Sequence, residues 1–339
     1  MSSVFLIHRG LLGAQKETPG ASSTVESSIA VSCDAMAALE VRSRSDYRGE
    51  TPSSGLRKVT KMVASRTTPT ALLLLVLLNP LLQASPSLEV QRSSLPHPVE
   101  EALTVELLSL APAGQGPWPA VLFVHGHQWP ERPGAEVYLE RGVLEAMARL
   151  GYLAAAVSQP GYGASDGAPD FCGPRSQQAV RAALEALRED PRVDPNRIVL
   201  YGASRGAIIA SMVATKEPAL AGLVLRGGIY DLEDAYQRMA DDFGGKHNLE
   251  KEAGTSPGTF LERSALRVEE EILVPTLFFH GEADPISPVH QARKLAQRIH
   301  RTGTPVDLMI FRGIGHRIPW ESRRERLESF LEEVFTLSE

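Results

Sequence analysis

Short apolar runs alternate with amphipathic segments from about residue 100 onward, and this alternation restricts the fold more than any other feature of the sequence. Strands that alternate with helices favour a parallel sheet with right-handed crossover connections. The run PAVLFVHG is apolar almost throughout, as expected of a strand that is covered on both faces. The sequence therefore predicts an α/β fold with a mostly parallel, doubly wound sheet and helices on both faces. The predicted strands lie within 102–110, 119–126, 153–163, 199–203, 221–228, 274–281 and 305–313.

The predicted helices follow these strands with the period of 3.6 residues that an amphipathic helix requires. Residues 137–152 are expected to form one helix, with Val143, Met147 and Leu150 along one stripe. Residues 176–190 should form an amphipathic helix that a proline ends. Further helices are expected after the strand at 199–203 and within 287–300 and 323–335.

The stretch VLYGASRGAII, residues 199–209, is where a predicted strand passes directly into a predicted helix. Gly202 and Gly206 flank Ser204, and glycines let the backbone pass where side chains would clash. A G-x-S-x-G pattern between a strand and a helix is typical of a turn that exposes a nucleophilic serine. A helix N-cap serine is the alternative interpretation. We expect Ser204 to be the catalytic nucleophile.

A serine hydroxyl needs a base to remove its proton, and that base is usually a histidine oriented by a carboxylate. The expected chain order is serine, acid, histidine. Asp284 and His316 follow two successive predicted strands in this order, and we expect them to complete a triad with Ser204. Asp231 is the competing acid, and His280 and His290 are less well placed histidines.

Acyl transfer also requires N–H donors for the developing oxyanion. One donor is expected to be the backbone N–H of Arg205, and the other that of His127 in the loop after residues 119–126, with Gln128 as the alternative. His125 is expected to be structural.

Two neighbouring side chains each leave two interpretations open. The Arg205 side chain could bind a negatively charged substrate or be anchored to a local carboxylate. Trp129 could form a pocket wall or pack against a lid.

Five segments resemble the α/β-hydrolase superfamily: HGH at 125–127, QPGYGASDG at 159–167, GASRG at 202–206, HGEAD at 280–284 and GIGH at 313–316. The resemblance covers roughly residues 100–337 and is closest to hydrolases related to prolyl oligopeptidase and dienelactone hydrolase. Hydrolases that resemble prolyl oligopeptidase carry a β-propeller before the hydrolase domain, and the segment before residue 100 is far too short to form one. Those that resemble dienelactone hydrolase use a cysteine as nucleophile, whereas residue 204 of this sequence is a serine. The chain therefore looks like a lone hydrolase domain.

Composition narrows the possible partners. The formal net charge of the 339 residues is −6, and this acidic balance excludes a nucleic-acid footprint. Two cysteines, Cys33 and Cys172, are too few for a disulfide framework. No C-x-x-C or H-E-x-x-H pattern occurs, so we expect no metal and no cofactor.

The N-terminal part differs in composition from the rest. Residues 1–61 are rich in Ser, Thr, Gly and Ala and are expected to be disordered or a mis-assigned extension that precedes a true start at Met62. Residues 62–85 have the layout of a signal peptide, which predicts a secreted or periplasmic protein. Their apolar run is too short for stable membrane insertion. Residues 86–339 are then the hydrolase domain, in which Cys172 is a free thiol.

An insertion of about 40 residues, approximately 232–271, lacks a clear strand and is large enough for a small helical lid. It is mostly polar, unlike the apolar lid that a lipase needs. The sequence therefore predicts a serine hydrolase of short-chain carboxylic esters, with a small-molecule ester as its partner. The alternatives are a small serine peptidase or amidase and a catalytically silent binding protein on the same fold. The oligomeric state is not indicated.

Overall fold

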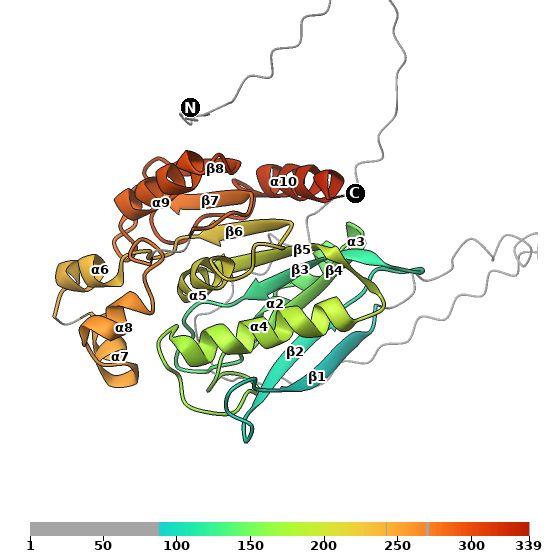
Figure 1. Cartoon of the computed structure of the whole chain (residues 1–339), viewed down its shortest axis with the longest axis horizontal. Helices are drawn as coiled ribbons and strands as arrows, with labels where there is room; N and C mark the ends of the chain where they lie inside the picture. Colours follow the sequence, from blue (N-terminus) through green and yellow to red (C-terminus); the bar gives the residue numbers. More distant parts are fainter. Residues whose placement is uncertain (1–87, 242, 269–270, 339) are drawn as a thin grey trace, which may run out of the picture. The chain divides into compact units, whose positions relative to one another are not determined.

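The computed structural model describes residues 88–241, 243–268 and 271–338 (Figure 1). The predicted extension, residues 1–61, and the predicted signal peptide, residues 62–85, lie outside the described residues. Within the described residues, no helix is both long and apolar enough to cross a membrane.

The centre of the fold is an eight-stranded sheet with the order β1-β2-β4-β3-β5-β6-β7-β8. Strands β3 to β8 pair in parallel, whereas β2 pairs antiparallel with both β1 and β4. The predicted α/β-hydrolase type of sheet, mostly parallel and doubly wound, is thereby confirmed. The strands are β1 (Val90–Pro96), β2 (Thr104–Leu110), β3 (Trp118–Val124), β4 (Leu153–Val157), β5 (Val193–Ala203), β6 (Gly222–Arg226), β7 (Thr276–Gly281) and β8 (Val306–Phe311).

Helices cover both faces of this sheet and form two apolar cores. Side chains of α4 (Pro174–Glu189), α5 (Arg205–Ala214) and α9 (Val289–Arg301) lie in one core. Those of α3 (Val143–Arg149) and α10 (Arg324–Leu337) lie in the other. Successive strand residues point to opposite faces, so a strand covered on both sides must be apolar throughout.

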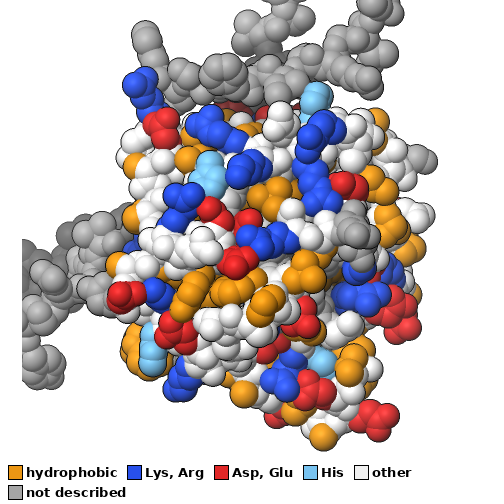
Figure 2. All heavy atoms as spheres, turned by 60° about the vertical axis from the view of Figure 1, so that its left-hand side comes forward, with side chains coloured by type: hydrophobic (Ala, Val, Ile, Leu, Met, Phe, Trp, Pro, Cys, Tyr) orange, Lys and Arg blue, Asp and Glu red, His pale blue; other side chains and the backbone are white. Residues whose placement is uncertain are grey.

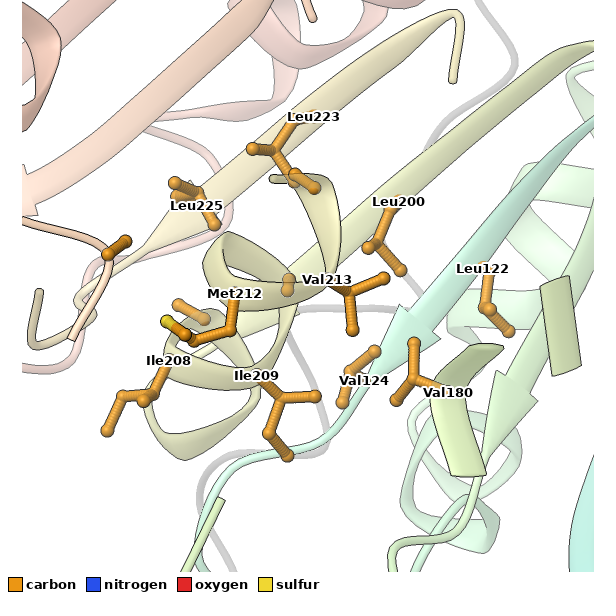
Figure 3. Close-up of a cluster of buried hydrophobic side chains, with 14 of the residues drawn as sticks. Leu122, Val124, Val180, Leu200, Ile208, Ile209, Met212, Val213, Leu223 and Leu225 are labelled. Atoms are coloured by element: carbon orange, nitrogen blue, oxygen red, sulfur yellow. The ribbon is translucent and has the colours of Figure 1, made fainter. Parts of the chain in front are cut away.

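Helix α5 packs most of its surface into the first core, which explains why the serine turn is followed by an uninterrupted apolar run. Figure 3 shows Ile208, Ile209, Met212 and Val213 of α5 among side chains of β3, β5 and β6. All ten residues of α5 are buried. The helix that begins at the serine turn is therefore fixed by packing on all sides.

Two predictions about local structure were wrong. Strand β1 was not among the predicted strands, because its largely exposed residues lack an apolar run. Residues 137–152 do not form one helix but α2 (Glu136–Glu140) and α3, separated by Gly142 with a φ of 63°. This left-handed residue ends α2 and changes the phase of α3, so that Leu144 is buried and Leu150 is 46% exposed.

The insertion after β6 contains three short helices, α6 (Leu232–Arg238), α7 (Gly244–Glu252) and α8 (Pro257–Leu261). Asp231 caps α6 by accepting a hydrogen bond from the Asp234 N–H, and Ser256 caps α8 in the same way through Thr259. In Figure 1 these helices lie on the side toward which the carboxyl ends of β6 and β7 point. Ligands of parallel sheets bind at such carboxyl ends.

Candidate active site

Ser204 occupies the turn between β5 and α5 with a φ of 55° and a ψ of −118°, a conformation that non-glycine residues rarely adopt. The two flanking glycines are required by close approach of neighbouring backbone. A Cβ on Gly202 would lie 2.4 Å from the Gly206 carbonyl oxygen, and one on Gly206 would lie 2.1 Å from that of Val124. The turn therefore has the compactness that the G-x-S-x-G pattern predicts.

Three side chains from distant parts of the sequence meet at this turn. The His316 Nε2 atom lies 2.9 Å from Ser204 Oγ, and its Nδ1 atom lies 2.8 Å from Asp284 Oδ2. The Asp284 side chain is fully buried, whereas 19% of the His316 side chain is exposed. The structure thus joins all three predicted triad residues in one chain of hydrogen bonds.

The carboxylate of Asp284 is held in its charged form. Burial opposes ionisation, but the hydrogen bond with His316 and those from the Ser287 and Ile286 N–H groups outweigh it and lower the pKa of Asp284. A carboxylate that accepts the Nδ1–H of a histidine leaves Nε2 free to accept the serine proton. This arrangement can move a proton from Ser204 to His316.

None of the three competing residues takes the place of Asp284 or His316 in the hydrogen-bonded triad. Asp231 caps α6 and forms an ion pair with Arg267 at 2.7 Å. His290 contacts Asp234 at 2.9 Å. His280 is fully buried beside the triad, where its Nε2 atom lies 2.9 Å from the Ser287 carbonyl oxygen, and burial lowers its pKa.

The two residues predicted as oxyanion donors lie on either side of the serine. A Cβ on Gly126 would lie 3.0 Å from Ser204 Cβ and 3.6 Å from Ser204 Oγ, so the loop that leads into His127 passes beside the hydroxyl. The Ala207 N–H makes an early bond of α5, to the Ser204 carbonyl oxygen at 2.9 Å. The Arg205 N–H precedes it and has no partner within the helix.

Two other side chains of the loop after β3 are structural. His125 is 1% exposed, and its ring lies 2.8 Å from the Gly126 carbonyl oxygen and accepts the Gln159 N–H at 3.1 Å. Burial lowers the pKa of His125 to about 4. The Gln128 amide bonds both the N–H and the carbonyl oxygen of Gly134, at 2.7 and 2.9 Å. These contacts fix the shape of the loop that leads into and out of His127.

The open interpretations of Arg205 and Trp129 are both narrowed by the structure. The Arg205 side chain is 8% exposed and is paired with the carboxylate of Glu252 in α7. It is therefore anchored to an acid, as the second interpretation requires, but that acid belongs to the insertion. Trp129 is 74% exposed, so packing against the lid is wrong. Sequence reasoning did not identify Glu252, because no local motif connects it with the serine turn.

Cys172 is a buried free thiol that contacts the residue after Ser204. Its Sγ donates a hydrogen bond to the Arg205 carbonyl oxygen at 3.4 Å, and burial raises its pKa to about 11. The protonated thiol is therefore a packing group with low reactivity.

Solved structures with this fold include both peptidases and esterases. A puromycin-hydrolyzing peptidase of Mycobacterium tuberculosis superposes with a TM-score of 0.62 at 22% identity, over 73% of this chain and 39% of that one. The Pyrococcus furiosus esterase Pf2001 superposes with a TM-score of 0.58 at 17% identity, over 83% of this chain and 100% of that one.

The sequence relatives are named as peptidases. The uncharacterized peptidase YtmA of Bacillus subtilis (strain 168) is 24% identical over 67% of this chain and 86% of its own length. The uncharacterized peptidase YuxL of the same organism is 23% identical over 60% of this chain, which spans only 32% of YuxL. Residues 173–336 match the prolyl oligopeptidase family. The chain therefore has the α/β-hydrolase fold, and its residues 173–336 are similar to the prolyl oligopeptidase family.

Proposed function

We propose that this protein is a serine hydrolase that cleaves carboxylic esters with short acyl chains. The observation that carries the proposal is the hydrogen-bonded chain from Ser204 through His316 to Asp284 at a turn beside the carboxyl ends of the strands. Ser204 Oγ attacks the acyl carbon while His316 takes its proton, and Asp284 stabilises the imidazolium. The N–H groups of Arg205 and His127 bind the oxyanion.

His316 then returns the proton to the leaving alcohol, and an acyl-enzyme remains on Ser204. Water, deprotonated by the same histidine, releases the acid and restores the serine. Apart from the water that releases the acid, every group in these steps is a side chain or backbone N–H of this chain.

The insertion supports short acyl chains over long ones. Three of its large apolar side chains, Leu232, Leu249 and Phe260, are buried in the core, and Leu261 is 47% exposed. A lipase lid would instead present a broad apolar face to an oil surface. Figure 2 shows the side of the molecule on which α6, α7 and α8 lie, with hydrophobic side chains in small groups among acidic and basic ones. An esterase neighbour that aligns over its whole length also favours ester chemistry.

A small peptidase or amidase is the second candidate, and the names of the matched relatives favour it. The same triad would act, but a leaving amine requires closer protonation by His316 than an alkoxide does. A catalytically silent binding protein is the third candidate, which the intact hydrogen-bonded triad disfavours.

A comparison of substrates tests the proposal. We expect a higher kcat/KM for p-nitrophenyl butyrate than for the palmitate, and little cleavage of peptide p-nitroanilides. Ser204→Ala should lower turnover by about four to six orders of magnitude, because the nucleophile is lost while the fold stays intact. A butyrate-to-palmitate ratio below one would indicate a lipase, preferred nitroanilides would indicate a peptidase, and activity retained by Ser204→Ala would exclude this nucleophile.

A further inference from the structure

The side chains of the two proposed oxyanion donors contact each other. The Arg205 Nη1 atom lies 3.0 Å from His127 Nδ1 and donates to the Tyr162 hydroxyl at 3.1 Å. Because arginine carries only donors, His127 Nδ1 must accept this bond, which places the proton of the neutral imidazole on Nε2. The Arg205 side chain thus connects α5, the helix that follows Ser204, to the loop after β3 that contains His127.

The insertion holds this guanidinium in place. Glu252 of α7 pairs with Arg205 Nη2, and both side chains are 8% exposed. The same carboxylate accepts the Phe171 N–H at 3.2 Å, and the guanidinium lies 4.1 Å from the centre of the Phe171 ring. The planar guanidinium of Arg205, whose N–H donors form a fork, is therefore held at one edge by Glu252 of α7 and on its flat face by the Phe171 ring.

A second contact connects the same two elements. The Asn248 Nδ2 atom of α7 lies 3.4 Å from His127 Nε2, and with the amide turned by 180° its Oδ1 atom accepts the Nε2–H. The His127 imidazole is thus held between Arg205 and α7. No such arrangement is needed for helix packing, since the remainder of α5 is buried among apolar side chains.

We propose that Arg205 is a positioning residue, which fixes the His127 loop against the insertion and so sets the place of the His127 N–H relative to Ser204. This inference rests on the proposed function. An oxyanion donor contributes only when it is already placed where charge develops in the transition state. A substrate-binding role for Arg205 is disfavoured because Glu252 already neutralises its buried charge.

The test must remove the fork without leaving a buried charge unpaired, since such a charge is strongly destabilising. The double variant Arg205→Met/Glu252→Met does so, and Arg205→Lys provides a second variant that keeps the charge but not the fork. Arg238→Gln is the matched control, because it breaks an exposed ion pair with Asp234 in the same insertion.

With p-nitrophenyl butyrate we expect kcat of the double variant to fall by about 10- to 100-fold, with KM within about threefold of the wild type. Loss of an entire oxyanion donor costs about 10²- to 10³-fold, and a displaced donor should cost less. Affinity for a trifluoromethyl ketone that mimics the tetrahedral intermediate should fall in parallel with kcat. Arg205→Lys should show a smaller loss in the same direction.

His127→Ala removes the imidazole but keeps the N–H, so it tests whether Arg205 acts through His127. Combined with the double variant, it should add less than the product of the separate effects. Three outcomes would overturn the positioning role. The first is that the effects of His127→Ala and of the double variant are independent. The others are that the double variant keeps its kcat, with either a lower Tm or a raised KM. Fluorophosphonate labelling separates the two proposals: a wild type not labelled on Ser204 fails the proposed function, whereas a labelled wild type with a fully active double variant fails only this inference.

Discussion

Ser204 has a backbone conformation that costs about 1–3 kcal/mol and persists only where its surroundings enforce it. The enforcing contacts are on both sides of the residue. The Ser204 N–H donates to the Arg226 carbonyl oxygen of β6 at 2.8 Å, and its carbonyl oxygen accepts from the Ala207 N–H. Strand β6 and helix α5 thus hold Ser204 in this strained conformation. The conformation directs the Ser204 hydroxyl toward His316.

Buried His125 makes the stability of the fold depend on pH. Its pKa is about 4 in the folded protein against an ordinary 6.5, so the unfolded chain takes up this proton first as the pH falls. The free energy of unfolding should therefore decrease between about pH 6.5 and pH 4, by roughly 3 kcal/mol from this residue. His125→Gln should flatten this part of the curve in urea unfolding.

His300 provides the matched control for this measurement, since it is exposed near the end of α9. His300→Gln should leave the slope of stability against pH unchanged. Equal slopes for the wild type and His125→Gln would contradict the assignment.

The junction of β5 and α5 depends on how closely two elements approach each other. Gly206, at the start of α5, lies against the end of β3, and Gly202, at the end of β5, lies against α5 itself. Neither glycine has a positive φ, so the requirement comes from contact and not from backbone conformation. The pattern G-x-S-x-G therefore describes packing between strand and helix as much as it describes a turn.

Gly206→Ala should destabilise the protein by about 1–3 kcal/mol and lower activity, because the new Cβ meets backbone of β3 that cannot move aside. Thermal unfolding and ester hydrolysis measure both effects. Gly244→Ala is the control, since a Cβ at this position in α7 has nothing within 4 Å. It should be neutral or stabilising by up to about 1 kcal/mol. Similar losses in both variants would exclude the close-contact explanation.

At the scale of the whole molecule, the site is assembled from loops that follow different strands of one sheet. Ser204 follows β5, Asp284 follows β7 and His316 follows β8, and parallel pairing brings these carboxyl ends to the same edge. The insertion between β6 and β7 then contributes Glu252 to the same region.

Export of the protein remains a proposal at this scale. We expect synthesis from Met62 and removal of residues 62–85, because a positive start, an apolar run and small residues such as Ala84 and Ser85 follow one another. N-terminal sequencing of the protein made from its native gene measures this. A mature chain that retains residues before Met62 would contradict the prediction.

The strand–helix order, the serine turn and the positions of Asp284 and His316 could all be predicted from the sequence. Each of these features is indicated by residues that are neighbours in the sequence. An apolar run indicates a strand that is buried on both faces, and the glycines around Ser204 indicate a tight junction between strand and helix. Fold topology then places residues at strand ends together without any knowledge of their contacts.

Other features depended on three-dimensional contacts between residues distant in the chain. Strand β1 is held by pairing with β2 and not by an apolar pattern, and Gly142 separates two helices that periodicity had merged. The partner of Arg205 is 47 residues away in the sequence, and its carboxylate is one of many in an acidic chain. Charge pairing carries no periodicity, so only packing of the insertion against the serine turn selects Glu252 for this role.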